Sequence, residues 1–339
     1  MTRNQTEHLL VADIGGTHAR FGMLGPNGSE EATYGIHQDR KYRCSEFSSM
    51  EQALGQYLTD HDLDSPSHAV IAVAAPVWGD RVQMTNLNWA FSVEAVRRQF
   101  GIEQMEVIND ASAGVLATTR LDEIECEPVK HGPGREGGAR VNLIPGTGFG
   151  IGAANLVGGR WVPVQGEGGH IGLAAGEPEE FDVLKALHSM KGRPSPENVL
   201  SGPGMLNLYH ALARVRDAAP EGYTPAEMTQ QALSGEDELC VTALAMYCRL
   251  LGSLAGDYAL VFGAHGGVYL SGNIIQKLNI DLLKREFVPR FLAKDKMNHE
   301  VADIPAFRVQ RANPGLLGAA VWLEGMFDPK ERHWSVRPN

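Results

Sequence analysis

A carboxylate, two glycines and a hydroxyl lie close together near the start of the chain, in the segment Asp13-Ile-Gly15-Gly16-Thr17. The apolar run Leu9–Ala12 before it is typical of a buried strand, and alternating residues after it predict a second strand. Glycines remove Cβ atoms from the bend, so its N–H groups could cradle a phosphate while Asp13 holds a hydrated Mg²⁺. The alternative is an ordinary tight hairpin, for which Gly-Gly is a common turn.

The same pattern returns in the segment Val141–Gly150, around Gly146-Thr147-Gly148. An apolar strand, a glycine bend with a threonine and a further strand over Phe149–Val157 are predicted, which we interpret as a second phosphate loop. Glycines at every second position resemble a dinucleotide-binding fingerprint. That fingerprint needs a helix directly after the glycines, and the residues that follow lack a helical pattern.

Asp110 is a candidate proton acceptor. It closes the predicted strand Met105–Asp110, comes directly after Asn109, and precedes a helix predicted over Ala111–Thr119. A carboxylate in this position could take a proton during catalysis, or it could simply cap the helix.

Three further polar side chains stand in loops of the second half of the chain. Glu167 and His170 lie in the glycine-rich segment Gly166–His170, and Glu197 lies in the segment Pro196–Gly204 between two predicted helices. Each has an ordinary alternative, because a lone histidine is more often structural and a glutamate at a helix start is commonly a solvated carboxylate.

Alternating strand and helix patterns predict an α/β protein, and the length of 339 residues suits about two domains. The run His68–Ala75 predicts a central strand, and Ser45–Leu63 has helical spacing of its apolar residues. Pro128–Gly138 is predicted to be a surface loop near a domain junction, which ends the first domain at about residue 120. A later strand ends at Gly272, where a helix begins, and a last helix is predicted over about 314–326.

Composition limits the possible partners and locations. The formal net charge of -11 and the absence of a basic stripe argue against nucleic acid. Four dispersed cysteines fit a reducing cytoplasm better than a disulfide scaffold. Met1–His8 has no apolar signal region, and the most apolar stretch, Leu239–Ala264, is interrupted by charge and predicted to be a buried helix, so no membrane segment is expected.

Short motifs with similar order and spacing along nearly the whole chain resemble the bacterial, ATP-dependent glucokinase family. Each is weak alone, and together they are specific: Asp13-Ile-Gly-Gly-Thr17, Met84-Thr-Asn86, Ile108-Asn-Asp110, Gly146-Thr-Gly148, Gly166-Glu-Gly-Gly-His170, Leu200-Ser-Gly-Pro-Gly204 and Asn313-Pro-Gly-Leu-Leu-Gly318. The chain departs from the family pattern at His18, where asparagine is common, at Ala111, where phenylalanine is usual, and at Ser271-Gly-Asn273, which replaces a Gly-Gly pair.

The resemblance implies an actin-like (ribonuclease H-like) ATPase/sugar kinase fold with a cleft between domains. It implies a small domain of residues 1–120 plus 313–339 and a large domain of residues 121–312. The implied reaction transfers the ATP γ-phosphoryl group to the glucose 6-hydroxyl, with Asp110 as catalytic base. The implied sugar-binding residues are Asn109, Asp110, Glu167, His170 and Glu197; the implied ATP-binding residues are Asp13, Gly15, Gly16, Thr17, Gly146, Thr147, Gly148 and Gly272.

The resemblance further implies Mg²⁺ held by Asp13 through water, a homodimer and a cytoplasmic enzyme. Two alternatives remain open at this point. One is a kinase of the same fold that acts on another hexose, and the other is a non-catalytic sugar-sensing protein.

Overall fold

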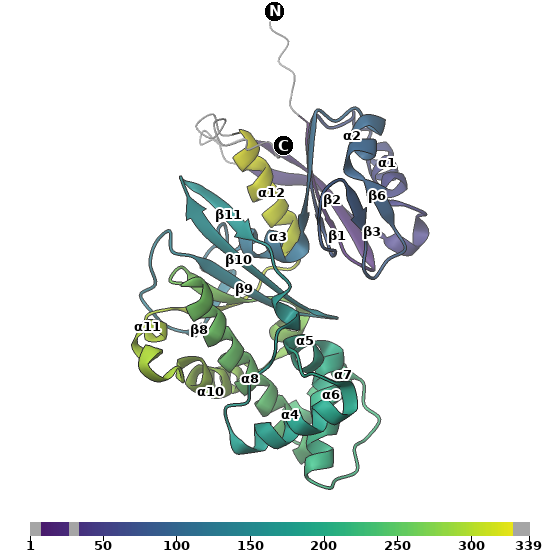
Figure 1. Ribbon diagram of the computed structural model, residues 1–339. Coiled ribbons are helices and arrows are strands. Elements are labelled where there is room, and N and C mark those ends of the chain that lie inside the picture. Colours follow the sequence, from purple (N-terminus) through teal and green to yellow (C-terminus); the bar gives the residue numbers. More distant parts are fainter. Residues whose placement is uncertain (1–7, 27–33, 328–339) are drawn as a thin grey trace, which may run out of the picture. The chain divides into compact units, whose positions relative to one another are not determined.

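The computed structural model describes residues 8–26 and 34–327. The chain divides into two compact units, each built around a sheet (Figure 1). The first unit takes its described residues from Met1–Arg120, Val157–Pro163 and Asn313–Asn339; the second consists of Leu121–Leu156 and Val164–Ala312. The expected strand-helix alternation is therefore confirmed as a mixed α/β architecture. Residues 1–7, on which part of the expectation about a signal region rests, lie outside the described residues.

The sheet of the first unit has the order β3-β2-β1-β4-β7. Its strands are β1 (Leu9–Ile14), β2 (His18–Pro26), β3 (Tyr34–Arg43), β4 (His68–Val73) and β7 (Gln104–Asn109). β1 is antiparallel to β2 and parallel to β4, and β4 is parallel to β7. The carboxyl ends of β1, β4 and β7 therefore meet at one edge of the sheet, and the loops that follow these strands are neighbours there.

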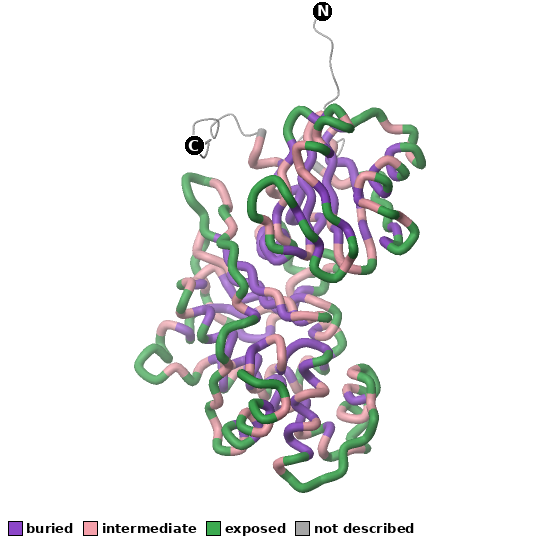
Figure 2. The backbone as a smooth tube through the Cα atoms, turned by 45° about the vertical axis from the view of Figure 1, so that its right-hand side comes forward, coloured by how far each residue is buried: buried purple, intermediate pink, exposed green. Residues whose placement is uncertain are grey.

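Helices cover both faces of this sheet (Figure 1). On one face, α1 (Met50–Asp60) and α2 (Val93–Gln99) complete a core in which the Phe21 and Tyr57 rings stack 5.4 Å apart. On the other face, α3 (Asp110–Ala117) and α12 (Pro314–Phe327) pack on the apolar residues Val11 and Ile108. The central strands β1 and β4 are each buried at every position but one, as expected for strands covered on both faces, and Figure 2 shows buried backbone in the interior of this unit. A small β5 (Arg81–Gln83) and β6 (Ala90–Ser92) pair stands apart.

A six-stranded sheet has the order β11-β10-β9-β12-β13-β8; its strands belong mainly to the second unit, except β11, which falls almost wholly in the segment Val157–Pro163 that groups with the first unit. Its strands are β8 (Cys126–Lys130), β9 (Arg140–Pro145), β10 (Phe149–Val157), β11 (Arg160–Val164), β12 (Gly267–Leu270) and β13 (Ala306–Val309). β9 and β10 form an antiparallel hairpin, whereas β12 runs parallel to β9 and β13.

Helices make up most of the rest of the second unit: α4 (Pro178–Lys191), α5 (Pro196–Leu200), α6 (Gly202–Val215), α7 (Pro225–Ser234), α8 (Glu238–Phe262), α9 (Asn273–Lys277), α10 (Ile280–Leu292) and α11 (Asn298–Ala302). Among the described residues, α8 alone is long and apolar enough to cross a membrane, and 67% of its most apolar window is buried in the unit. Its apolar residues contribute to the core around Leu250, Leu251 and Phe287. α8 is therefore a core helix, as the sequence predicts.

Some predicted elements were wrong in type or extent. The predicted loop Pro128–Gly138 begins inside β8, which is possible because β8 is the edge strand and Pro128 need not donate to a second neighbour. The helix predicted from Ser45 begins at Met50, because the Ser49 side chain accepts the Gln52 N–H and caps the helix there. The sequence analysis did not anticipate α10, which contains Pro289.

Candidate active site

The first glycine segment forms the predicted strand–turn–strand between β1 and β2. The Gly15 N–H donates to the His18 carbonyl at 2.9 Å and closes the turn. At Gly16, a Cβ would meet Asn86 Cβ at 3.0 Å, so this glycine lets the loop after β5 approach. A Cβ at Gly15 would meet only the His18 carbonyl, at 3.8 Å. The turn is thus compact at Gly16 and sterically open at Gly15, where a ligand could approach the backbone.

Asp13 lies at the end of β1, against the first turn of α12. A Cβ at Gly315 would fall 2.6 Å from Asp13 Oδ2, so the helix backbone and the carboxylate are in close contact. Burial, followed by the negative charge of Asp110, raises the pKa of Asp13 to about 6, and Arg20 opposes this rise. The negative charges of two such carboxylates repel each other, and a bound cation would relieve that repulsion.

These residues fit a weakly held Mg²⁺ ion. Mg²⁺ takes oxygen ligands and is usually bound through one or two carboxylates, with waters and substrate phosphates completing its shell. Within residues 8–26 and 34–327, no group of three or more His, Cys, Asp or Glu side chains could hold a metal. Asp13, with the negative charge of Asp110 acting on it, offers carboxylate oxygens of the kind that Mg²⁺ takes as ligands.

The sequence left open whether Asp110 is a proton acceptor or the cap of the helix that follows, and the structure gives the role of cap to Asn109. Asn109 is the N-cap of α3: its Oδ1 accepts the Ala111 N–H at 2.8 Å, and its Nδ2 donates to the Ala75 carbonyl at 3.1 Å. Asp110 is the first helical residue, and its side chain is exposed. Its Oδ1 also accepts the Ala111 N–H, at 2.8 Å. Because Asn109 caps the helix, Asp110 is not needed as its cap.

The second glycine loop joins β9 to β10 and is tied to the start of α6. The Gly146 N–H donates to the Gly148 carbonyl at 2.9 Å, and the Gly146 carbonyl accepts the Gly202 N–H at 2.8 Å. A Cβ at Gly146 would meet nothing within 4 Å, and Thr147 is exposed. As in the first turn, one glycine of this loop leaves open space beside the backbone.

Glu197, on α5, is held against this second loop. Its Oε2 accepts the Phe149 N–H at 3.1 Å. A Cβ at Gly148 would lie 2.7 Å from the same oxygen, which explains the glycine there. Glu197 is therefore an oriented carboxylate rather than a solvated one.

The loop that carries Glu167 and His170 is held by contacts with buried residues of the second unit. The Tyr258 hydroxyl donates to the Gly168 carbonyl at 2.7 Å, and Gly169 is buried against the Phe149 carbonyl, with no room for a Cβ. Residues Gly168–His170 form a 3₁₀ turn that packs against α5, while the Glu167 and His170 side chains are exposed. The structure thus brings the second glycine loop, Glu167, His170 and Glu197 together within the second unit.

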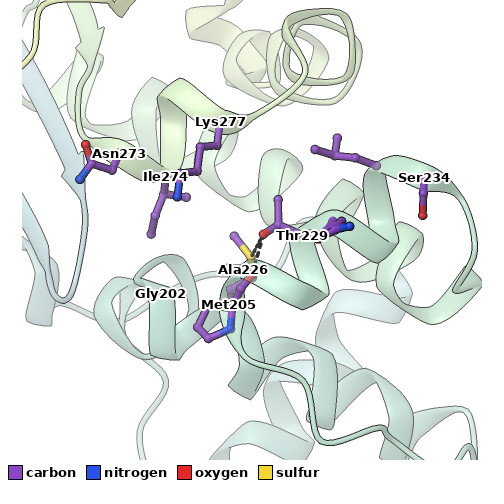
Figure 3. A pocket seen from close by; sticks show the side chains of 11 residues that line it. Gly202, Met205, Ala226, Thr229, Ser234, Asn273, Ile274 and Lys277 are labelled. Carbon is purple, nitrogen blue, oxygen red and sulfur yellow. Dashed lines mark hydrogen bonds between the residues drawn. The ribbon is translucent and has the colours of Figure 1, made fainter.

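An apolar pocket of about 600 Å³ lies in the second unit, next to the start of α6, to which the second glycine loop is bonded (Figure 3). Its walls come from α6, α7 and α9, with Met205, Thr229 and Ile274 among them. Gly202, whose N–H binds the Gly146 carbonyl, also lines it. The sequence analysis missed this pocket, because it forms only where α9 packs against α6 and α7, from which α9 is distant in sequence. The one signal nearby was the strand end at Gly272.

Gly272 separates the end of β12 from α9. Its φ of 99° lies in the region that favours glycine, and a Cβ there would meet the Pro145 carbonyl at 2.6 Å. Gly272 therefore sets the close approach of α9, which lines the pocket, to the strand that precedes the second glycine loop.

Comparison with known proteins gives a consistent result. A glucokinase family model matches residues 10–326. The curated glucokinase of Saccharophagus degradans is 38% identical over 316 residues, which cover 93% of this chain and 98% of that protein. The glucokinase of Aromatoleum aromaticum is 37% identical over 318 residues, covering 93% and 94%.

A solved structure agrees with the sequence comparisons. The crystal structure of a glucokinase from an Antarctic psychrotroph aligns with a TM-score of 0.87 at 34% identity, covering 94% of this chain and 99% of that one. Both the sequence and the fold are thus shared over almost the full length of these relatives, and the chain belongs to the glucokinase family.

Proposed function

We propose that this protein transfers the γ-phosphoryl group of ATP to the 6-hydroxyl of glucose, giving glucose 6-phosphate and ADP. Family membership over residues 10–326 makes the chain an ATP-dependent hexose kinase. The observation that carries the assignment of the chemistry is Asp110: it is exposed, Asn109 and not Asp110 is the N-cap of α3, and its charge raises the pKa of Asp13.

Asp110 acts as the catalytic base in this proposal. It accepts the proton of the attacking hydroxyl and fixes its direction, and a loose transition state for phosphoryl transfer requires that proton only late. The Ala111 N–H, at 2.8 Å from Asp110 Oδ1, holds the carboxylate in place at the start of α3. The first turn of a helix also favours a negative charge.

Asp13 and the two glycine loops serve the phosphates. Asp13 would hold Mg²⁺ through water, and bound Mg²⁺ supplies neutralisation of the phosphate charge. The open space beside Gly15 and Gly146 lets phosphate oxygens approach the two turns, and the exposed hydroxyls of Thr17 and Thr147 offer donors to them. The N–H groups of Gly15 and Gly146 themselves close the turns. Gly16 and Gly148 contribute by permitting close packing rather than by leaving open space.

Glu167, His170 and Glu197 are proposed to bind the sugar hydroxyls, together with Asn109. The second amide proton of Asn109 is not used by its bond to Ala75, so the side chain has a donor to spare. Hydrogen bonds to charged groups are worth about 1.5–3 kcal/mol each. A sugar that lacks one hydroxyl would leave a carboxylate unpaired, which predicts sharp discrimination between hexoses.

The apolar pocket between α6, α7 and α9 is proposed to take the adenosine of ATP. Its volume of about 600 Å³ and its apolar walls suit a nucleoside, and Gly202 links it to the second phosphate loop. In this proposal Gly272 supports the pocket wall, through α9, rather than contacting a phosphate.

A substrate panel tests the proposed function. The purified protein is assayed with ATP and Mg²⁺ on glucose, mannose and fructose, with ADP formation coupled to an optical signal. The highest turnover on glucose supports the proposed glucokinase activity, whereas a preference for mannose or fructose supports a kinase of the same fold that acts on another hexose. Glucose binding without turnover would identify a sugar sensor. A homodimer and a cytoplasmic location are further proposals from the family, and light scattering tests the first.

A further inference from the structure

Two cationic residues, Lys41 and Arg43, lie beside the first glycine turn, at the end of β3. β3 is an edge strand of the five-stranded sheet and pairs with β2, whose first residue, His18, lies opposite Arg43. Directly after this pair, the Cys44 N–H donates to the Thr17 carbonyl at 2.9 Å and continues the contact into the turn. The end of β3 is therefore fixed to the turn that is proposed to receive phosphate.

The two cations share a face of the sheet with Asp13. The register places Asp13 opposite Arg20 and Arg20 opposite Lys41, so these three residues form a row across three strands. Residues paired in this way carry their side chains on the same face, and Arg43, two positions further along β3, is on that face too. Adjacent strands are about 4.8 Å apart, so the Cα atoms of Asp13 and Lys41 are roughly 10 Å apart.

The charges of Lys41 and Arg43 are not neutralised within the described part of the chain. Both residues are exposed, and neither forms an ion pair with a described carboxylate; Asp39, the one acidic residue of β3, pairs with Arg20 instead. Desolvation, followed by the positive charges of Lys41 and Arg43, lowers the pKa of His18, which agrees with their position around this ring. Neighbouring like charges repel each other, and a bound anion would relieve that repulsion.

We propose that Lys41 and Arg43 contact the terminal phosphates of the phosphoryl donor and extend the first glycine turn into a cationic subsite. Phosphates at this turn carry several negative charges and approach the carboxylate of Asp13, so positive groups on the same sheet face favour their binding. The ligand class is a chain of phosphates, of which ATP is the member that the proposed function requires. This inference rests on the proposed function, because it concerns the donor of the same reaction.

Removal of the two charges, with a matched control on the same strand, tests the proposal. Lys41→Gln and Arg43→Gln are compared singly and together, and Arg40→Gln is the control. Arg40 is also exposed, but it lies on the opposite face of β3, where its charge acts on Asp60. We expect the KM for ATP to rise about threefold in each single variant and about tenfold in the double variant, with the KM for glucose unchanged. Arg40→Gln should match wild type.

Inorganic tripolyphosphate gives a second readout that does not require turnover and contains no nucleoside. Titration calorimetry measures its binding and that of ATP, each with Mg²⁺. The double variant should weaken both by a similar factor, and added salt should reduce the difference from wild type, because exposed charges are screened. The exchange of the two cations, Lys41→Arg with Arg43→Lys, keeps both charges and should restore binding.

Three results would overturn the proposal. One is a double variant that binds ATP and tripolyphosphate as Arg40→Gln does. Another is weakened binding of ATP with unchanged binding of tripolyphosphate, which would assign Lys41 and Arg43 to the nucleoside. The third is a wild-type protein that does not bind tripolyphosphate.

Failure of this inference and failure of the proposed function can be told apart. If wild type does not phosphorylate glucose but the double variant loses affinity for tripolyphosphate, the proposed function fails and the phosphate subsite stands. If wild type phosphorylates glucose and the double variant keeps the wild-type KM for ATP, the phosphate subsite fails and the proposed function stands.

Discussion

Asp13 and Gly315 are in such close contact that a Cβ at position 315 would fall 2.6 Å from Asp13 Oδ2. This relationship joins the end of β1, next to the first glycine turn, to a helix that begins about 300 residues later, at Pro314. The lack of a Cβ at Gly315 thus allows the first turn of α12 to approach the Asp13 carboxylate.

Gly315→Ala should therefore displace the Asp13 carboxylate. We expect kcat to fall about tenfold or more, with the loss partly recovered by raising Mg²⁺, because Asp13 is proposed to hold the ion. Steady-state kinetics over a Mg²⁺ series measure this. Gly222→Ala is the matched control, since a Cβ there meets nothing within 4 Å. Equal kinetics for both variants would contradict the role given to Asp13.

The raised pKa of Asp13 predicts a pH-dependent cost to stability. The folded state binds this proton more tightly than the unfolded state, in which the pKa is near 3.8, so the cost is absent below pH 4 and complete above about pH 6. Asp13→Asn should be more stable than wild type by on the order of 1–3 kcal/mol at pH 8, without metal. Urea unfolding at pH 8 and pH 4 tests this, and a gain that persists at pH 4 would refute it.

Glu197→Gln should impair glucose binding more than ATP binding. The amide oxygen of glutamine can still accept the Phe149 N–H, so the loop stays intact while the charge offered to the sugar is lost. We expect the KM for glucose to rise about 10- to 100-fold, in line with the loss of a hydrogen bond to a charged group. Glu236→Gln, at an exposed position before α8, is the control. A larger rise in the KM for ATP would assign Glu197 to the nucleotide instead.

Tyr258→Phe tests whether glucose binding depends on the hydrogen bond between Tyr258 and the loop that carries Glu167 and His170. The hydroxyl donates to the Gly168 carbonyl at 2.7 Å, and burial raises its pKa to about 12, so it remains a donor at physiological pH. Its loss should raise the KM for glucose about 3- to 10-fold, since a neutral hydrogen bond contributes about 0.5–1.5 kcal/mol. Tyr269→Phe removes a hydroxyl bonded to the Gly266 carbonyl and should leave this KM unchanged.

The sequence predicted those parts of the fold that depend on neighbouring residues. The glycine turns between β1 and β2 and between β9 and β10 were found because alternation and turn chemistry are local signals. The family resemblance placed Glu197 among the sugar ligands, but no local pattern showed that Phe149 orients it. That contact joins residues that are 48 positions apart.

Other features could not be predicted because they depend on tertiary packing. The pocket lined by Met205, Thr229 and Ile274 exists only when α6, α7 and α9 pack together. Likewise, no pattern near Trp78 and Trp89 distinguishes the first, which is 76% exposed, from the second, which is buried. The sequence also could not show which residue caps α3, because asparagine and aspartate are both good capping residues; in the structure the cap is Asn109.

The most direct test of the account compares glucose phosphorylation by wild type and Asp110→Asn under saturating ATP, Mg²⁺ and glucose. The fold should be retained, because Asn109 still caps α3. We predict rapid formation of glucose 6-phosphate by wild type and a kcat lower by about 10²–10⁴-fold in the variant, the usual contribution of a general base. Wild-type turnover by Asp110→Asn, or no phosphorylation of glucose by the wild-type protein, would contradict the central claim.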